Sequence, residues 1–348
     1  MLQTIHRTLG LALEGRGLDW RSCFSLVRSE PPDGRIVTVE CSDARILEDI
    51  RAALPAAGID SSRVRLVCLP DSRSSLPERF VVSASVADLR KEPSHAAELL
   101  TQAIAGDGLL PLKRSGDWVL VRMDDGYHGW VRNWHLNPIS NNELNDFMRE
   151  ARFRVLDNVI RVVEAPDEGS LPVCDAVAGT ALVARECRRR GWRAVSFADG
   201  RSGFTKTRYL ERVPTRRRVS REKLGKTGLR FLGIPYVWGG TTSKGFDCSG
   251  LIQRVFRLHG VLLPRDADLQ SRYGREKAVG RAGALRTGDL LFFGKNEMQI
   301  AHVAMYLSNG LFLHARGHVR VNALDSLHPL FDGKLVGEWC RARDPLSR

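Results

Sequence analysis

A cysteine at the expected start of a helix constrains this chain more than any other feature. A segment rich in glycine and threonine, 235–246, ends at Asp247, and apolar residues then recur at helical spacing until Gly260. This pattern predicts a helix that Asp247 caps and Cys248 begins. Free amides and the positive end of the helix dipole favour a thiolate there, which lowers a cysteine pKa from about 8.5. The alternative is an inert buried cysteine, since cysteine is often buried.

The overall composition is that of a soluble globular protein. The 348 residues are 43% hydrophobic and 27% charged, and the length suggests two or three domains. The net charge of +13 fits nucleic acid, an anionic wall polymer or acidic peptides as a partner, but dispersed surface arginine explains it more simply. No recognisable nucleic-acid motif occurs, so we expect no nucleic-acid partner.

Cysteine usage and the opening segment point to a reducing compartment. The seven cysteines form no Cys-x-x-Cys pair, and the first residues do not resemble a secretory signal. No run approaches the length of a membrane span. We therefore expect a cytoplasmic protein without membrane insertion. No cluster of His, Cys and carboxylates has ligand spacing, so no metal or other cofactor is expected.

Changes in pattern along the chain predict four domains, which span residues 1–78, 79–139, 140–214 and 215–348. The first is expected to be a small α/β unit with a strand at 35–40, a helix at 43–56 and a strand at 63–69. Its cysteines, Cys23, Cys41 and Cys68, are expected in its core. We expect a docking or scaffold role for it.

Short strands separated by turns predict a small β-barrel in the second domain. Strands are expected at 80–86, 116–122 and 129–132, with Trp118 and Trp130 as core aromatics. The segments around these tryptophans resemble bacterial SH3-like domains.

The third domain repeats this plan more loosely. Segment 191–195 echoes 116–121, and segment 199–204 echoes 125–130 with Phe204 in place of tryptophan. Two tandem barrels follow. A basic connector at 212–218 leads into the last domain, and we expect it to be solvated.

Two histidines lie on an expected hairpin in the last domain. The runs 300–307 and 311–315 each hold one histidine, and Ser308-Asn309-Gly310 suits a three-residue turn. Pairing of the two runs across this turn brings His302 and His314 to one face, within hydrogen-bonding reach. A single strand histidine is usually structural, but two beside a helix-start cysteine favour nucleophilic catalysis. The Cys248 thiolate would attack, His302 would hold the thiolate and later protonate the leaving amine, and His314 would fix the tautomer of His302.

These segments together resemble the NlpC/p60 family of papain-like cysteine peptidases. The blocks that carry the resemblance are 235–240, 247–251, 263–266, 288–290, 301–303 and 314–315, within residues 220–345. The resemblance implies an α+β multidomain protein, in which two small SH3-like barrels and the N-terminal α/β unit precede a domain of helices packed on an antiparallel sheet. It implies Cys248 as nucleophile, His302 as base and His314 as orienting residue, with Tyr236 helping to hold the oxyanion. Tyr236 as a core tyrosine is the alternative.

The first barrel narrows the resemblance to γ-D-glutamyl-L-diamino-acid endopeptidases that recycle murein peptides. By matching position, Glu92 and Tyr127 would hold the free amine of an N-terminal L-alanine, with Asp247 near the same charge. The alternative is a surface charge and a packing tyrosine. Matching positions also place Trp238, Ser249, Asp266 and Ala267 along the substrate. Ala267 departs from the serine expected there and can offer only its backbone to a substrate.

The leading hypothesis is a cysteine peptidase that cuts free murein stem peptides after γ-D-glutamate and releases L-Ala-D-Glu. One alternative is an exported hydrolase of intact peptidoglycan whose SH3-like barrels bind the wall. Another is a binding protein with an inert catalytic domain, against which the intact cysteine, histidines and tyrosine argue.

Overall fold

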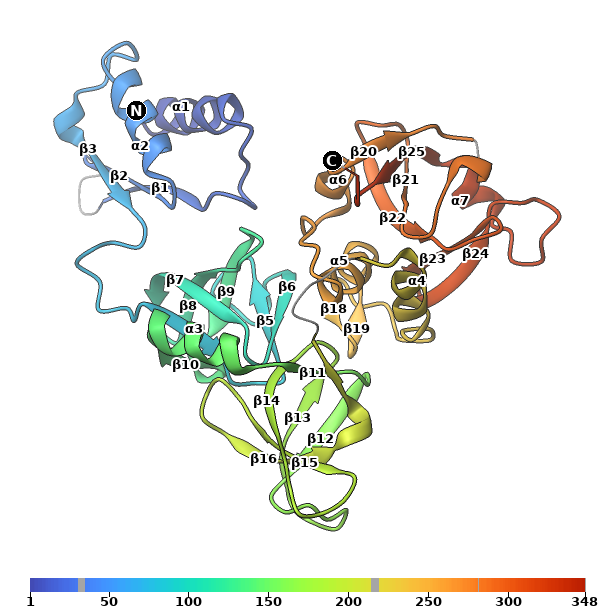
Figure 1. Cartoon of the computed structure of the whole chain (residues 1–348). Helices are drawn as coiled ribbons and strands as arrows, with labels where there is room; N and C mark the ends of the chain where they lie inside the picture. Colours follow the sequence, from blue (N-terminus) through green and yellow to red (C-terminus); the bar gives the residue numbers. More distant parts are fainter. Residues whose placement is uncertain (31–34, 214–218, 281, 348) are drawn as a thin grey trace.

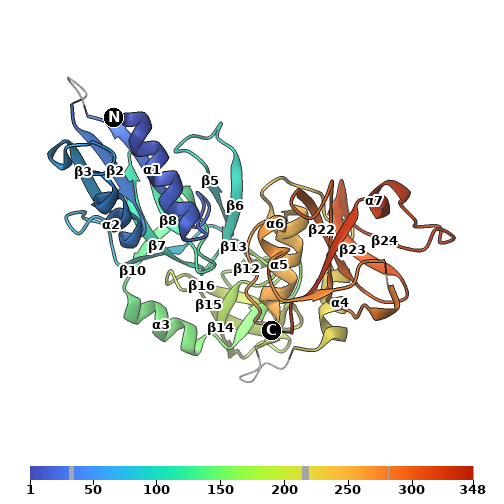
Figure 2. The same ribbon diagram turned by 90° about the horizontal axis from the view of Figure 1, so that it is seen from above.

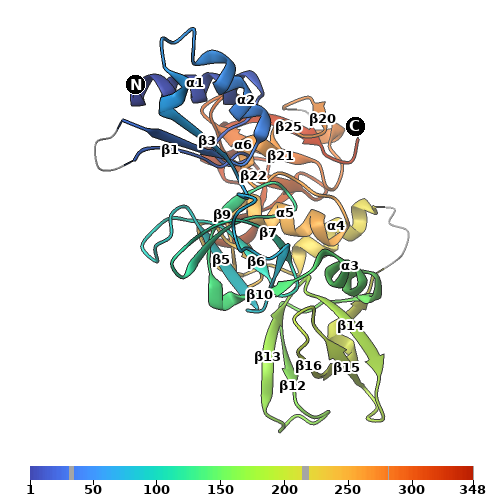
Figure 3. The ribbon, with the colours of Figure 1, turned by 90° about the vertical axis from the view of Figure 1, so that its left-hand side faces the viewer.

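The computed structural model describes residues 1–30, 35–213, 219–280 and 282–347. They form an N-terminal unit, two barrels and a C-terminal unit, with the N-terminal unit and the second barrel at opposite ends of the molecule (Figures 1 and 3). Seen from above, the hairpin β5–β6 of the first barrel lies between the N-terminal and C-terminal units (Figure 2). Most of the expected basic connector, residues 214–218, lies outside the described residues. No helix in the described part of the chain is long and apolar enough to cross a membrane.

The N-terminal unit is a three-stranded sheet with two helices. Strand β2 lies in the middle, antiparallel to β1 and parallel to β3. Helix α2 and strands β2 and β3 confirm the expected elements, whereas α1 and β1 were not expected. Cys23 and Cys41 are buried as expected, but Cys68 is exposed because it ends an edge strand. The elements are α1 (Leu2–Gly15), β1 (Ser25–Ser29), β2 (Val37–Cys41), α2 (Ala44–Ala53), a 3₁₀ turn (Ser61–Arg63) and β3 (Val64–Cys68).

The first barrel has seven strands in the order β10-β4-β7-β8-β9-β5-β6. The single strand expected at 80–86 is wrong, because a turn at 83–85 separates β4 from β5. Trp118 and Trp130 are buried as expected, and they pack against Phe24 and Leu69 at the junction with the N-terminal unit. The elements are β4 (Arg79–Val82), β5 (Val86–Arg90), β6 (Leu99–Ile104), β7 (Gly108–Ser115), β8 (Trp118–Arg122), β9 (His128–Arg132), a 3₁₀ turn (Asn133–His135) and β10 (Leu136–Ile139).

The second barrel repeats the first in its topology. Its strand order is β13-β12-β16-β15-β14-β11-β17. When each barrel is numbered from its own first strand and this order is read from its other end, it is the same as that of the first barrel. This identity of strand order supports the tandem repeat expected from two weak sequence echoes. The elements are α3 (Asn141–Glu150), β11 (Phe153–Val155), β12 (Val159–Val163), β13 (Pro172–Val177), β14 (Ala181–Glu186), β15 (Trp192–Ser196), β16 (Ser202–Lys206), a 3₁₀ turn (Thr207–Tyr209) and β17 (Leu210–Arg212).

The C-terminal unit packs helices on a six-stranded antiparallel sheet of order β20-β25-β21-β22-β23-β24. Leu251 and Val255 of α5 are fully buried in one core with Val303 and Leu313 of the sheet. Each such side chain contributes roughly 1.5–3 kcal/mol on burial. This core fixes the start of α5 over strands β22 and β23.

The elements of the C-terminal unit are α4 (Arg221–Leu229), β18 (Thr241–Thr242), β19 (Gly245–Phe246), α5 (Cys248–Leu258), α6 (Ala267–Gln270), β20 (Arg275–Lys277), a 3₁₀ turn (Ala282–Ala284), β21 (Leu290–Gly294), β22 (Ile300–Tyr306), β23 (Leu311–Arg316), β24 (His318–Ala323), α7 (Gly333–Gly337) and β25 (Trp339–Asp344).

Candidate active site

Helix α5 begins at Cys248, as the sequence predicts. Asp247 caps it, and its Oδ1 accepts a hydrogen bond from the backbone N–H of Gly250 at 2.7 Å. The backbone of the preceding loop packs closely on this first turn. A Cβ atom at Gly250 would lie 2.1 Å from the carbonyl oxygen of Gly240, so only glycine fits there.

A buried arginine that the sequence analysis had not assigned a role holds this first turn. Arg265 is 1% exposed, and its guanidinium binds both carboxylate oxygens of Asp247, at 3.0 and 2.5 Å. It also donates to the hydroxyl of Ser249 at 2.8 Å and to that of Thr101 in β6 at 3.1 Å. The first barrel is thereby tied directly to the helix that carries Cys248.

The two predicted histidines meet on the hairpin β22–β23. Met305 pairs with Leu313 and Tyr306 with Phe312, a register that puts the two histidines on one face as predicted. His302 Nε2 lies 2.8 Å from His314 Nδ1. The local register therefore brings the imidazoles together without help from the rest of the chain.

Asn322 on β24 extends this pair and was missed in the sequence. Its Oδ1 lies 2.8 Å from His314 Nε2, and its Nδ2 donates to the carbonyl oxygen of Leu330 at 2.7 Å. A carbonyl can only accept, so Oδ1 is left to accept the proton on His314 Nε2. Neutral His314 then accepts at Nδ1 from His302 Nε2–H. His302 keeps an unprotonated Nδ1, which is the atom a general base needs.

The thiol and both imidazoles are uncharged in the free protein. Burial, reinforced by the Asp247 carboxylate, raises the pKa of Cys248 to about 12. The backbone N–H groups of Val303 and Ser249 favour the thiolate, but their effect is smaller. The thiolate predicted from the helix start is therefore wrong for the free protein, because desolvation outweighs the helix terminus. Burial likewise lowers the pKa of His302 to about 3 and that of His314 to about 4.

Cys248 opens into a cavity of about 490 Å³ between three units of the protein. Eight of the predicted site residues line it: Tyr127, Tyr236, Trp238, Asp247, Cys248, Ser249, Asp266 and Ala267. Burial raises the pKa of Tyr236, so its hydroxyl is protonated at neutral pH and able to donate. Leu99 and Leu100 of the first barrel complete the apolar part of the wall.

The structure does not bring Glu92 to this cavity. Glu92 is exposed in the loop between β5 and β6, because the chain turns back on itself there and returns through Glu98. Glu98 lines the cavity instead, and its Oε1 accepts from the indole N–H of Trp238 at 3.1 Å.

Asp247 lines the cavity but does not offer a free carboxylate to an amine. In addition to Arg265 and Gly250, it accepts from the backbone N–H of Gly239 at 3.0 Å and from the hydroxyl of Ser249 at 3.3 Å. Asp266 is the more available acid. Its Oδ2 accepts from the hydroxyl of Tyr127 at 3.0 Å, and no hydrogen bond within the described residues reaches its Oδ1.

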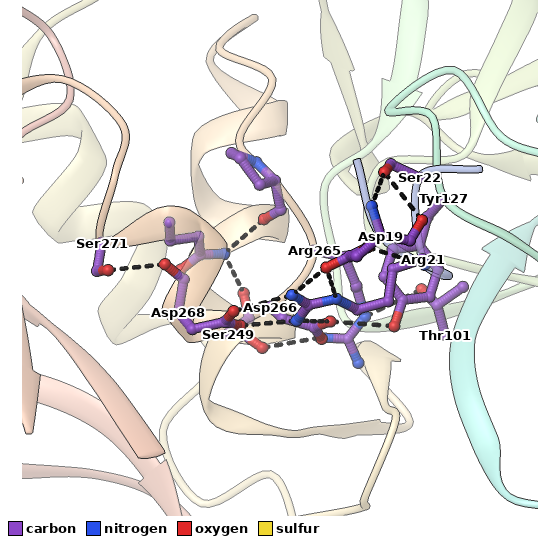
Figure 4. A network of polar contacts seen from close by, with 12 residues as sticks. Asp19, Arg21, Ser22, Thr101, Tyr127, Ser249, Arg265, Asp266, Asp268 and Ser271 are labelled. Atoms are coloured by element: carbon purple, nitrogen blue, oxygen red, sulfur yellow. Dashed lines mark hydrogen bonds and ion pairs between the residues drawn. The ribbon is translucent and has the colours of Figure 1, made fainter. Parts of the chain in front are cut away.

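Two lining residues come from the N-terminal unit, Trp20 and Arg21. Arg21 donates to Asp266 at 3.1 Å and to Asp268 at 2.8 Å (Figure 4). No pattern in the sequence indicated this contact, because it joins residues 245 positions apart. Among the described residues, no group of three or more His, Cys, Asp or Glu side chains could hold a metal ion.

Comparison with known proteins decides the family. The NlpC/P60 family model matches residues 233–337, and the bacterial dipeptidyl-peptidase Sh3 domain matches residues 89–136. A gamma-D-glutamyl-L-lysine dipeptidyl-peptidase of Bacillus subtilis (strain 168) is 31% identical over 229 residues, which cover 62% of this chain and 71% of that protein. The chain belongs to the NlpC/P60 family. This NlpC/P60 protein is a cysteine peptidase.

Other relatives extend the similarity along most of the chain. A gamma-D-glutamyl-L-lysine dipeptidyl-peptidase of Bacillus cereus is 29% identical over 324 residues, covering 87% of this chain and 92% of that protein. A crystal structure of an NlpC/P60 family protein from Bacillus cereus superposes with a TM-score of 0.67 at 24% identity, covering 77% of this chain and 99% of that one. These findings confirm the α+β multidomain fold with a papain-like peptidase domain and SH3-like barrels.

Proposed function

We propose that this peptidase hydrolyses the bond between γ-D-glutamate and a diamino acid in free murein stem peptides that begin with L-alanine, releasing L-Ala-D-Glu. The observation that carries the proposal is the acidic lining of the cavity beside Cys248. Asp266 and Glu98 both line it, and within the described residues no hydrogen bond reaches Oδ1 of Asp266. Relatives named gamma-D-glutamyl-L-lysine dipeptidyl-peptidases support it.

The cavity favours a ligand with a free ammonium group. Its described lining holds four carboxylates and one guanidinium, and with Arg265 on Asp247 and Lys91 near Glu98 the carboxylates still outnumber the cations by one. An ammonium supplies donors and a positive charge to these acceptors. An acylated amine keeps only one N–H donor and carries no positive charge, so it leaves the negative excess of the wall uncompensated.

The proposed chemistry starts from the neutral thiol. Cys248 Sγ attacks the γ-carbonyl carbon of D-glutamate while its proton passes to Nδ1 of His302. The oxyanion accepts hydrogen bonds from the Cys248 N–H and the Tyr236 hydroxyl. Cleavage of the C–N bond returns the proton from His302 to the leaving amine and leaves a thioester. Water, deprotonated by His302, then hydrolyses the thioester and restores the thiol.

A pair of matched substrates tests the proposal. We expect L-Ala-γ-D-Glu-L-Lys to be cleaved about 100-fold more efficiently than its N-acetyl form, because a site built for a polar group strongly rejects an analogue that lacks it. The diaminopimelate tripeptide measures the preference for the diamino acid. Cys248→Ala is expected to abolish turnover of both. Equal cleavage of the free and acetylated peptides would refute amine recognition.

Intact sacculi separate the proposal from the wall-hydrolase alternative. We expect no clearing of a sacculus suspension, since the stem peptides there are N-acylated by the glycan. Clearing would support the alternative. Use of the free peptide inside the cell is part of the proposal, and fractionation of cells with detection of the chain tests it.

A further inference from the structure

The loop 19–22 of the N-terminal unit reaches the cavity of the C-terminal unit. It follows α1 and precedes β1, in a part of the chain that neither matched family model includes. Trp20 and Arg21 both line the cavity. The N-terminal unit, which the sequence analysis left as a scaffold, is thus part of the cavity wall.

The loop is ordered by its own hydrogen bonds. Asp19 Oδ1 accepts from the backbone N–H of Arg21 at 2.9 Å, and the carbonyl of Asp19 accepts from the N–H of Cys23 at 2.9 Å. On the rim, Lys91 Nζ lies 5.3 Å from the centre of the Trp20 ring and 3.8 Å from Glu98. The loop is therefore held on both sides, by its own turn and by the first barrel.

Arg21 uses all five of its N–H donors on three carboxylates. Nε and Nη2 donate to Asp19 Oδ2 at 2.9 and 2.5 Å, Nη1 donates to Asp266 Oδ2 and Asp268 Oδ1, and Nη2 also donates to Asp268 Oδ2 at 2.9 Å. The side chain is only 16% exposed. A guanidinium with no donor left does not bind a ligand itself. It acts on the carboxylates that it holds.

Its effect on Asp266 is the one that matters for a ligand. Arg21 and Tyr127 both donate to Oδ2 of Asp266, and no hydrogen bond within the described residues reaches Oδ1, which is left to accept from a ligand in the cavity that Asp266 lines. Burial raises the pKa of Asp266, while Arg265, Arg21 and the Tyr127 hydroxyl favour its ionised form. Without Arg21, Asp19, Asp266 and Asp268 would lose the guanidinium that they share.

We propose that loop 19–22 forms the far wall of the substrate cavity and that Arg21 is a positioning residue, which fixes Asp266 to receive the ammonium group of the peptide. This rests on the proposed function for the identity of the ligand. It assigns a role to the N-terminal unit and makes the cavity a product of three units. Arg21, which lies outside the catalytic unit, then contributes to the affinity for a substrate with a free amine.

Kinetics of Arg21→Ala and Arg21→Lys with L-Ala-γ-D-Glu-L-Lys test the proposal. For Arg21→Ala we expect KM to rise about tenfold with kcat within about twofold, because a charge-assisted contact is misplaced but the thiol and histidines are intact. Arg21→Lys keeps one charge and is expected to recover part of the loss. Arg16→Ala is the matched control, since Arg16 pairs with Asp49 on the surface of the same unit. A rise in kcat/KM for Arg21→Ala would overturn the proposal by showing that the loop is a plug.

Chemical labelling of Cys248 tests the effect of Arg21 on the charge of the cavity without any substrate. Cationic and anionic methanethiosulfonate reagents of equal size are compared by the rate of modification of the peptide that contains Cys248. We expect Arg21→Ala to raise the ratio of cationic to anionic rates by about tenfold, because the wall loses its guanidinium. An unchanged ratio would overturn the proposal. If the wild-type protein fails to cleave the tripeptide, the proposed function falls, while this ratio still decides whether Arg21 shapes the cavity.

Discussion

The buried ion pair between Arg265 and Asp247 supplies the sharpest prediction. The two side chains are 0% and 11% exposed, and they lie 2.5 Å apart at closest approach. With charge centres about 4 Å apart and an effective dielectric constant of about 20, their attraction is about 4 kcal/mol. Arg265→Gln removes it and leaves a buried carboxylate without a counter-charge. We expect a loss of about 3–5 kcal/mol in the free energy of unfolding.

Thermal unfolding followed by circular dichroism measures this loss. At about 2–4 °C per kcal/mol, the melting temperature of the C-terminal unit is expected to fall by about 6–20 °C. Peptidase activity is expected to fall with it, because the same pair holds the first turn of the helix that begins at Cys248. The combined variant Arg265→Met with Asp247→Asn is expected to recover more than half of the stability, since asparagine still caps a helix and no charge is left buried.

The same protein holds a matched control on its surface. Arg45 pairs with Asp43, which caps α2, so the chemistry is the same as at Asp247, but Arg45 is 65% exposed. Exposed pairs contribute little, so Arg45→Gln is expected to leave the melting temperature unchanged. The reasoning fails if Arg265→Gln has the same melting temperature as the wild type, or if the combined variant is less stable than Arg265→Gln alone.

Three further predictions concern the site. Asn322→Ala frees the proton on His314 and is expected to lower kcat about tenfold or more with little change in KM, which steady-state kinetics would measure; an unchanged kcat would contradict the tautomer assignment. Glu98→Gln is expected to raise KM for the free-amine tripeptide several-fold, and Glu92→Gln is the control that leaves KM unchanged. A higher KM for Glu92→Gln alone would instead support Glu92 as the residue that holds the amine. Because folding lowers the pKa of His302 to about 3 and of His314 to about 4, the unfolded chain binds more protons below pH 6.5, so stability is expected to fall as pH drops from about 6.5 toward 4. Denaturant titrations of the wild type and of His314→Gln would show it, and a stability that stays flat in the wild type would refute it.

The sequence predicts best what depends on neighbours along the chain. The start of α5 at Cys248 and the meeting of His302 with His314 follow from local periodicity and a three-residue turn, and both are confirmed. The tandem repeat of the two barrels was only suggested by weak sequence echoes, and the shared strand order supports it. The expected thiolate fails for a different reason, because desolvation at Cys248 depends on the whole fold rather than on the helix start.

Contacts between units were beyond the sequence. Glu92 was expected at the cavity and Glu98 lines it instead, because a matching position does not reveal how a loop turns. Arg265 had no assigned role, although its block had been noted, since a buried arginine is recognised only by its partners. Arg21 joins the site from 245 residues away, and no spacing rule reaches that far.

The chain of hydrogen bonds from His302 ends on the main-chain carbonyl of Leu330, in the loop between β24 and α7. Every residue type offers that same carbonyl, so side-chain replacement at position 330 leaves the final acceptor in place. Evolution is accordingly free to vary the amino acid there, provided that the loop keeps its path. The position of the proton on His302 thus depends on the path of the backbone in this loop. An insertion or deletion in the loop is expected to lower activity more than any substitution of the side chain at position 330.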